Sequence, residues 1–269
     1  MSSRPPLDPM TSMWHWLAYD LRFYRERAGL TGTELGKIIG VVRSTVSRLE
    51  AADLKLDDRQ TMALDRHWKT GGHFFRLLTY AKLGHDPDWF KEHVDRESKA
   101  SVIKIFEHSV IPGLLQTEAY ARVIFRVGGV KDIDADVATR MARQEALFRP
   151  DPPLVWVLLN QAAIELPVGG AAVMREQLAR LLEVSELPDV MLRVVPRAVG
   201  WHSGMDGAFK LLTVGREESA YTQACGGGRL VLDAEEVRAY GLRYDRIGSE
   251  ALSRDSSRSL IKEVMESMQ

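Results

Sequence analysis

Apolar residues recur at helical spacing through the first part of the chain. Leu17, Leu21 and Tyr24 follow one another at intervals of three or four residues, which places their side chains on one face of a helix. Thr31 begins a second helical pattern, and Glu34, three residues later, completes the signature of a capping box. A series of short helices is therefore predicted. Two further helices are predicted at residues 73–83 and 87–99.

Short β-prone runs replace this spacing after residue 100. Strands are predicted at residues 102–106, 154–159, 190–195, 209–214, 220–224 and 229–232. Helices are predicted at residues 117–127, 134–148, 171–184 and 259–268. Helices mixed with strands that are joined by glycine-containing turns indicate an α+β domain, and we expect its sheet to be mostly antiparallel.

The two patterns predict a multidomain chain. Its length of 269 residues is enough for two compact units. We expect an all-α domain at residues 14–70, a helical linker at 71–100, and an α+β domain at 101–269.

The composition of the chain excludes several classes of protein and of site. Hydrophobic residues make up 45% and charged residues 27%, which excludes a collagen-like or wholly disordered chain. Cys225 is the single cysteine, so an intrachain disulfide and a cysteine-rich zinc site are excluded. The first 13 residues lack the apolar run of a signal peptide, and the most apolar stretch, residues 154–164, is about half the ~20 residues of a membrane span. We expect a cytoplasmic protein.

Residues 29–50 carry the pattern of two crossing helices joined by a tight turn. Gly36 lies where the first helix approaches the second, and there a side chain larger than that of alanine would push the helices apart. Gly40 stands at the turn, where positive φ favours glycine. Four apolar positions supply the contacts between the helices: Leu35, Ile39, Val46 and Leu49.

The outward face of this segment is rich in hydrogen-bonding side chains, which can reach base edges or phosphates of duplex DNA. The candidate DNA-binding residues are Thr33, Lys37, Arg43, Ser44, Thr45, Ser47 and Arg48. Residues 14–71 contain ten Lys and Arg and eight Asp and Glu, an excess of +2. Because so small an excess favours weak binding by a monomer, we expect a homodimer on an inverted repeat of double-stranded DNA.

This segment resembles the helix-turn-helix of lambda-repressor-like regulators of the xenobiotic-response-element class, on the motif STVSRLE at residues 44–50 and on Leu-Thr-x-x-Glu-Leu-Gly at 30–36. Further motifs are similar to those of a large actinobacterial regulator family of the WhiJ type. They lie at residues 110–122 (VIPGLLQTEAYAR), 143–144 (RQ), 167–170 (PVGG), 174–181 (MREQLARL) and 195–209. The similarity covers nearly the whole chain.

The resemblance implies a transcriptional regulator with a helix-turn-helix DNA-binding domain at residues 14–70 and a regulatory or interaction domain at 101–269. It implies a repressor in an antitoxin-like arrangement, with a small partner protein encoded nearby. It also implies roles in development, a nucleoid-associated location and a C-terminal domain that binds the partner or dimerises. The chain departs from the family pattern at two places. Gly32 replaces a glutamine that contacts phosphate, and Ala51-Ala52 replaces the Asn-Gly type of turn after the recognition helix.

Two alternatives stay open for the second domain. A small-molecule sensor is the runner-up, with a pocket lined by the aromatic residues Trp156, Trp201, Phe209 and Tyr221. An enzyme that uses Cys225 with His202 and the Gly226–Arg229 run is the weaker alternative, since nothing in the sequence brings a base to the thiol. The histidines show no metal-ligand spacing, and neither a metal nor a cofactor is expected.

Overall fold

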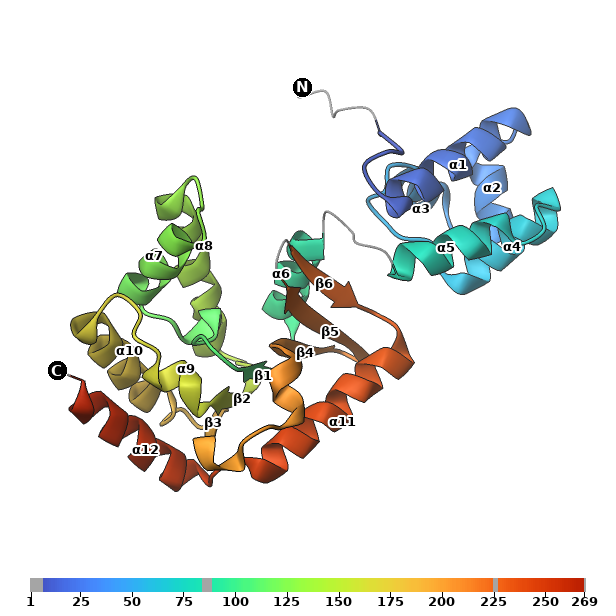
Figure 1. The fold of residues 1–269 in the computed structure, drawn as a ribbon. Coiled ribbons are helices and arrows are strands. Elements are labelled where there is room, and N and C mark those ends of the chain that lie inside the picture. Colours follow the sequence, from blue (N-terminus) through green and yellow to red (C-terminus); the bar gives the residue numbers. More distant parts are fainter. Residues whose placement is uncertain (1–6, 84–88, 225–226, 269) are drawn as a thin grey trace. The chain divides into compact units, whose positions relative to one another are not determined.

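The computed structural model describes residues 7–83, 89–224 and 227–268. The chain divides into two compact units, Met1–Phe90 and Lys91–Gln269 (Figure 1). The division falls inside the predicted linker at residues 71–100, so that one of its two helices belongs mainly to each unit. Each unit has an apolar core of its own.

The described part of the first unit is helical. Its helices are α1 (Met13–Arg27), α2 (Gly32–Ile39), α3 (Arg43–Glu50), α4 (Asp58–Trp68) and α5 (His73–Leu83). They share one apolar cluster in which Leu21, Leu35 and Leu64 are fully buried. Phe74 and Leu78 of α5 belong to the same cluster, so this helix is part of the core of the unit.

Local contacts set the ends of α2. The backbone N–H of Glu34 donates to Thr31 Oγ1 at 3.2 Å, and the backbone N–H of Thr31 donates to a Glu34 carboxylate oxygen at 2.7 Å, so the predicted capping box forms. Gly40 ends the helix with φ of 75°, as expected for a turn that favours glycine. A Cβ on Gly36 would lie 2.4 Å from the carbonyl oxygen of Val41, so even alanine is too large there.

The second unit contains a six-stranded sheet. Its strands are β1 (Val102–Glu107), β2 (Leu154–Asn160), β3 (Val190–Val195), β4 (Phe209–Val214), β5 (Glu217–Ala224) and β6 (Gly227–Val231), in the order β3-β2-β1-β4-β5-β6. β1 pairs with β2 and β2 with β3 in parallel, whereas β1–β4, β4–β5 and β5–β6 are antiparallel. The sheet is mixed: three of these five pairings are antiparallel and two are parallel, and the expectation of a mostly antiparallel sheet did not specify the two parallel pairs. Long helical crossovers precede β2 and β3, and such crossovers join parallel strands.

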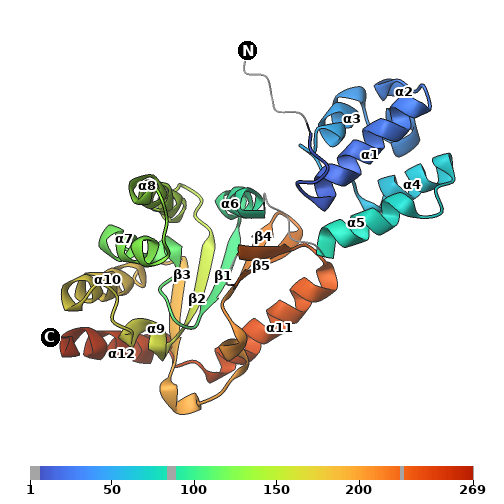
Figure 2. The same ribbon diagram turned by 45° about the horizontal axis from the view of Figure 1, so that its top comes forward.

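Helices cover both faces of this sheet (Figure 2). The helices of the unit are α6 (Trp89–Lys99), α7 (Glu118–Val127), α8 (Ile133–Arg143), α9 (Gln161–Glu165), α10 (Ala171–Val184), α11 (Ala234–Glu250) and α12 (Arg254–Ser267), with short 3₁₀ turns η1 (Gly113–Leu115), η2 (Gln144–Phe148), η3 (Arg197–Val199) and η4 (Ser203–Asp206). On β1, Ile103 and Ile105 pack into the larger core with α7, α10 and α12, while Phe106 points to the face that α11 covers. None of the helices that the structure describes is both long and apolar enough to cross a membrane.

The outer edge of β3 is occupied by the segment that follows α11. The backbone N–H of Val194 donates to Ser257 Oγ at 2.9 Å, and its carbonyl accepts from the N–H of Leu252, also at 2.9 Å. The guanidinium of Arg193 donates to the carbonyl oxygens of Ala251 and Leu252 at 2.6 and 2.7 Å. The chain itself therefore takes up backbone groups that an edge strand would otherwise expose.

Ala52, directly after α3, has a φ of 57°, whereas Ala51 has a φ of −96°. A side chain disfavours the left-handed conformation by about 1–2 kcal/mol, so we expect Ala52→Gly to raise the free energy of unfolding of the first unit by roughly 0.5–1 kcal/mol. Ala51→Gly, the matched control, should lower it by a similar amount because glycine gains only chain entropy there. Chemical denaturation followed by circular dichroism checks both variants. Shifts of the same sign would contradict the strain at Ala52.

Candidate nucleic-acid interface

The exposed side of α2 and α3 carries the candidate DNA-binding residues. α3 buries Val46 and Leu49 against the core of the first unit. The opposite side of the two helices is open to solvent, with Thr45 half-buried and the others exposed: Thr33, Lys37, Arg43, Ser44, Ser47 and Arg48. The helical spacing that buries one face of α3 thus directs its polar side chains outward.

Arg43 lies against the start of α2. A Cβ built on Gly32 would be 3.4 Å from Cγ of Arg43 and 3.9 Å from a methyl group of Val46. A side chain at position 32 would therefore begin in ordinary van der Waals contact with the stem of Arg43.

The cations of this face differ in their partners from other cations of the same unit. Arg22 on α1 pairs with Glu26 at 2.8 Å, and Lys82 pairs with Asp58 at 2.8 Å. Within residues 7–83, by contrast, the side chains of Arg43 and Arg48 form no hydrogen bond and no ion pair. Their guanidinium groups keep all their donors for an external acceptor.

The N-terminus of α3 is also open. Its N-cap residue is Val42, whose side chain is 67% exposed and cannot accept a hydrogen bond from the first turn. In the described chain, no side chain caps this end of the helix. The first backbone N–H groups of α3 therefore face solvent, where an anion is stabilised by these donors and by the helix dipole.

A half-buried ion pair holds α3 on α1. Arg25 Nε donates to one carboxylate oxygen of Glu50 at 2.5 Å and its Nη2 donates to the other at 3.0 Å. The remaining Nη1 donates to the carbonyl oxygen of Leu30 at 3.0 Å. The count of cations in residues 14–71 included Arg25, because no local signal connects residues 25 positions apart. In the structure this arginine instead supports the position of α3.

The aromatic residues proposed for a sensor pocket do not come together. Phe209 is buried on the α11 face of the sheet, whereas Tyr221 lies on the other face and stacks on His93 at 4.3 Å between ring centroids. Trp201 is 78% exposed. His202 is buried and accepts from the N–H of Gly204 at 3.2 Å. Cys225 and Gly226 lie outside the described residues, so the structure does not test the alternative that uses this thiol.

The sequence did not reveal a buried ionic cluster in the second unit. Glu97 of α6 is 2% exposed and pairs with Arg143 of α8, whose Nη2 lies at 2.5 Å, and with Lys210 of β4. Burial alone would raise the pKa of this carboxyl, but the charges of Lys210 and Arg143 outweigh burial and lower it to about 2. The cluster ties α6 to α8 and to the sheet.

Two other titratable groups lie near this cluster. Burial, aided by the charge of Lys210, lowers the pKa of His93 to about 3. Burial raises the pKa of Glu107, at the end of β1, to about 7, against the opposing effect of Lys210. In residues 7–83, 89–224 and 227–268, no group of three or more His, Cys, Asp and Glu side chains is arranged to hold a metal ion.

One comparison with known proteins gives a match. A family model described as a domain of unknown function, DUF5753, matches residues 90–263. No curated protein matches the chain. The matched range corresponds closely to the second compact unit, so it does not include α2 and α3.

The Arg25–Glu50 pair predicts a measurable contribution to stability. The two side chains are 17% and 12% exposed, so Glu50→Gln should leave the half-buried guanidinium with only its 3.4 Å contact to the exposed Glu26 and lower the free energy of unfolding by about 2 kcal/mol. The double variant Arg25→Met/Glu50→Leu should lose less than the two single changes together, since it strands no charge.

Denaturation midpoints of the full chain check this effect. Arg22→Gln is the matched control, because it removes only the Arg22–Glu26 pair, which is 61% and 52% exposed, and its midpoint should barely change. Equal midpoints for Glu50→Gln and Arg22→Gln would show that the Arg25–Glu50 pair does not hold α3.

Proposed function

The chain belongs to the DUF5753 family, and we propose that it is a sequence-specific DNA-binding transcriptional regulator that reads duplex DNA with the exposed face of α3. The observation that carries this proposal is the division of α3 into two faces. Val46 and Leu49 are buried, and the opposite side presents Arg43, Ser47 and Arg48 to solvent. An α-helix with such a face fits the major groove of B-DNA.

Each polar residue of the face has a role that its chemistry suggests. The guanidinium forks of Arg43 and Arg48 suit the O6 and N7 acceptors of guanine, and the hydroxyls of Ser44 and Ser47 suit single acceptors on bases or phosphates. Lys37 on α2 suits the phosphate backbone. We assign Thr33 and Thr45 to the same backbone contacts.

Two further features support phosphate contacts. The uncapped N-terminus of α3 offers backbone donors and a positive dipole end to one phosphate. Arg59 of α4 is exposed, and its Nη2 lies 4.0 Å from the position that a Cβ on Gly40 would take, close to the turn between α2 and α3. The arginine adds positive charge beside the proposed contact surface.

We also propose that the working unit is a homodimer in the cytoplasm, associated with the nucleoid, and that the regulator is a repressor of the antitoxin-like kind. The excess of charge in the first unit is only ten cations minus eight anions. A dimer doubles the phosphate contacts and matches a two-fold symmetric operator.

The second unit offers a surface for the dimer partner or for a small protein encoded nearby. Leu154, Trp156 and Met191 are 43%, 36% and 42% exposed, and Trp156 and Met191 are direct neighbours in the pairing of β2 with β3. Adjacent exposed apolar side chains of this size are typical of protein contacts. This surface is the docking site that we propose for a protein partner.

Replacing either arginine of α3 by alanine tests the reading face. We expect Arg43→Ala and Arg48→Ala each to weaken specific binding by roughly 1–3 kcal/mol, because a bidentate contact to guanine is lost. Selection from a random duplex library provides the site, and fluorescence anisotropy with the full chain measures the affinity.

Arg22→Ala is the control for the loss of one positive charge in the same unit, since Arg22 is paired with Glu26. Its affinity should stay within about threefold of the wild type. Full operator affinity in both α3 variants would refute the assigned face. Lys37→Ala should weaken binding to all sequences alike and reduce the salt dependence.

The dimer predicts the spacing of the operator. Light scattering at micromolar concentration should give twice the mass of 30.3 kDa, and footprints should show two half-sites about 34–36 Å apart or a multiple of that. Trp156→Asp places a charge on the apolar surface of the second unit and should reduce the mass to that of one chain if this surface joins the dimer. A wild-type monomer that protects one asymmetric half-site would contradict the dimer.

A further inference from the structure

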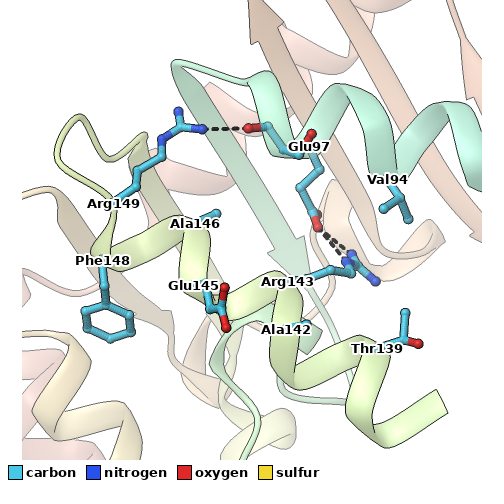
Figure 3. Close-up of a pocket in the computed structure, with 10 residues that line it drawn as sticks. Val94, Glu97, Thr139, Ala142, Arg143, Glu145, Ala146, Phe148 and Arg149 are labelled. Atoms are coloured by element: carbon cyan, nitrogen blue, oxygen red, sulfur yellow. Dashed lines mark hydrogen bonds and ion pairs between the residues drawn. The ribbon is translucent and has the colours of Figure 1, made fainter. Parts of the chain in front are cut away.

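A groove lies in the second unit between α6 and the helical segment α8–η2. Its volume is about 810 Å³, within the range of about 300–1,000 Å³ that is usual for small-molecule sites. Val94 and Ser98 line it from α6, and Ala142, Ala146 and Phe148 line it from the opposite side (Figure 3). Every lining residue belongs to one compact unit.

Small side chains keep the groove open. Ala142 is exposed and Ala146 half-buried, although they lie one helical turn apart on the side that faces α6. Larger apolar residues at these positions would fill the space between the two helices, as side chains do in the core beneath. Phe148, at one end, leaves its ring 58% exposed. The groove thus presents apolar carbon atoms to solvent.

The charged residues of the lining are already satisfied or balanced. Arg149 donates to the carbonyl oxygens of Ser98, Ala100 and Asp151 at 2.6, 2.7 and 2.6 Å. Arg143 pairs with Glu97, as the dashed lines of Figure 3 mark. The lining contains two arginines, Arg143 and Arg149, and two glutamates, Glu97 and Glu145. Their formal charges sum to zero. The low pKa of Glu97 keeps this balance at neutral pH.

We propose that this groove binds a neutral, predominantly apolar small molecule, whose flat body lies between Val94 on one side and Ala142 and Ala146 on the other and reaches the ring of Phe148. An anionic ligand would have to leave water without an unmatched cation in the lining, because Arg143 and Arg149 are already paired, and this is costly. A neutral apolar body instead replaces water on carbon surface, which is favourable. Nucleotides and other anionic ligands are thereby disfavoured.

The position of the groove gives its ligand a route to regulation. α6 forms one wall of the groove and is the next helix in the chain after α5 of the first unit. A ligand that contacts both α6 and α8 stabilises one placement of α6 on the second unit. It changes DNA affinity only as far as it binds the DNA-competent and incompetent states unequally. This regulatory step rests on the proposed function, whereas the binding site does not.

Paired fluorescent probes test the ligand class with the full chain. N-phenyl-1-naphthylamine is neutral and apolar, and anilinonaphthalene sulfonate is its sulfonated relative. We expect the neutral dye to bind at one site per chain and the sulfonate to bind at least about tenfold more weakly, because its charge finds no partner. Absence of saturable binding of the neutral dye, or tighter binding of the sulfonate, would overturn the proposal.

Filling the groove locates the site. Ala142→Trp and Ala146→Trp should each weaken binding of the neutral dye by about tenfold or more, since the indole takes the space of the ligand. Ala138→Trp is the matched control, because Ala138 is exposed on the same helix but does not line the groove. Circular dichroism and the thermal midpoint confirm that all three variants fold. Equal dye binding in the wild type and both groove variants would refute the site.

Hydrogen exchange and DNA-binding measurements distinguish ligand binding in the groove from its proposed effect on DNA affinity. The neutral dye should slow amide exchange in α6 of the wild type and leave exchange in Ala142→Trp unchanged. Operator affinity should shift when the dye saturates the wild type, but not in Ala142→Trp. An unchanged affinity would overturn the regulatory step alone, whereas a chain that binds the dye but no duplex DNA would overturn the proposed function and leave the site intact.

Discussion

A carboxylate that leaves water must be matched by cations, and in each unit such a match holds a helix on which one of the proposals depends. In the first unit Glu50 at the end of α3 is matched by Arg25 of α1, which approaches both of its oxygens. In the second unit Glu97 of α6 is matched by Arg143 and Lys210. Breaking either match strands a charge, so the helix positions are coupled to electrostatics as much as to apolar packing.

Contacts between neighbours in the chain were accessible to sequence reasoning. The Thr31–Glu34 capping box spans three residues and formed as predicted, and the six predicted strands appear with ends shifted by a few residues. α11 was missed, because only Val237, Tyr244 and Ile247 are buried over its 17 residues, which gives a weak periodic signal. The parallel pairing of β1 with β2 and of β2 with β3 was not predicted, because strand direction depends on the connecting crossovers rather than on the strands themselves.

Contacts between distant residues had no such signal. Lys210 and Glu97 are 113 positions apart, and neither is unusual in its local sequence. The groove depends on the absence of bulk at Ala142 opposite Val94, and alanine in a helix ordinarily indicates only helix propensity. The candidate DNA-binding residues could be selected because helical periodicity alone separates the exposed side of α3 from the buried side. That the guanidinium groups of Arg43 and Arg48 have no partner within residues 7–83, however, is a property of the fold.

The covered edge of β3 limits how the second unit can associate with other molecules. Since Ser257 and Leu252 already take the N–H and C=O groups of Val194, no incoming strand can extend the sheet along the full length of that edge. The sheet therefore ends at β3, and covering this edge protects the folded chain from strand-to-strand aggregation. Any specific assembly there must use side chains such as Trp156 and Met191, whose shape and chemistry select a partner, rather than the backbone, which is the same in every protein.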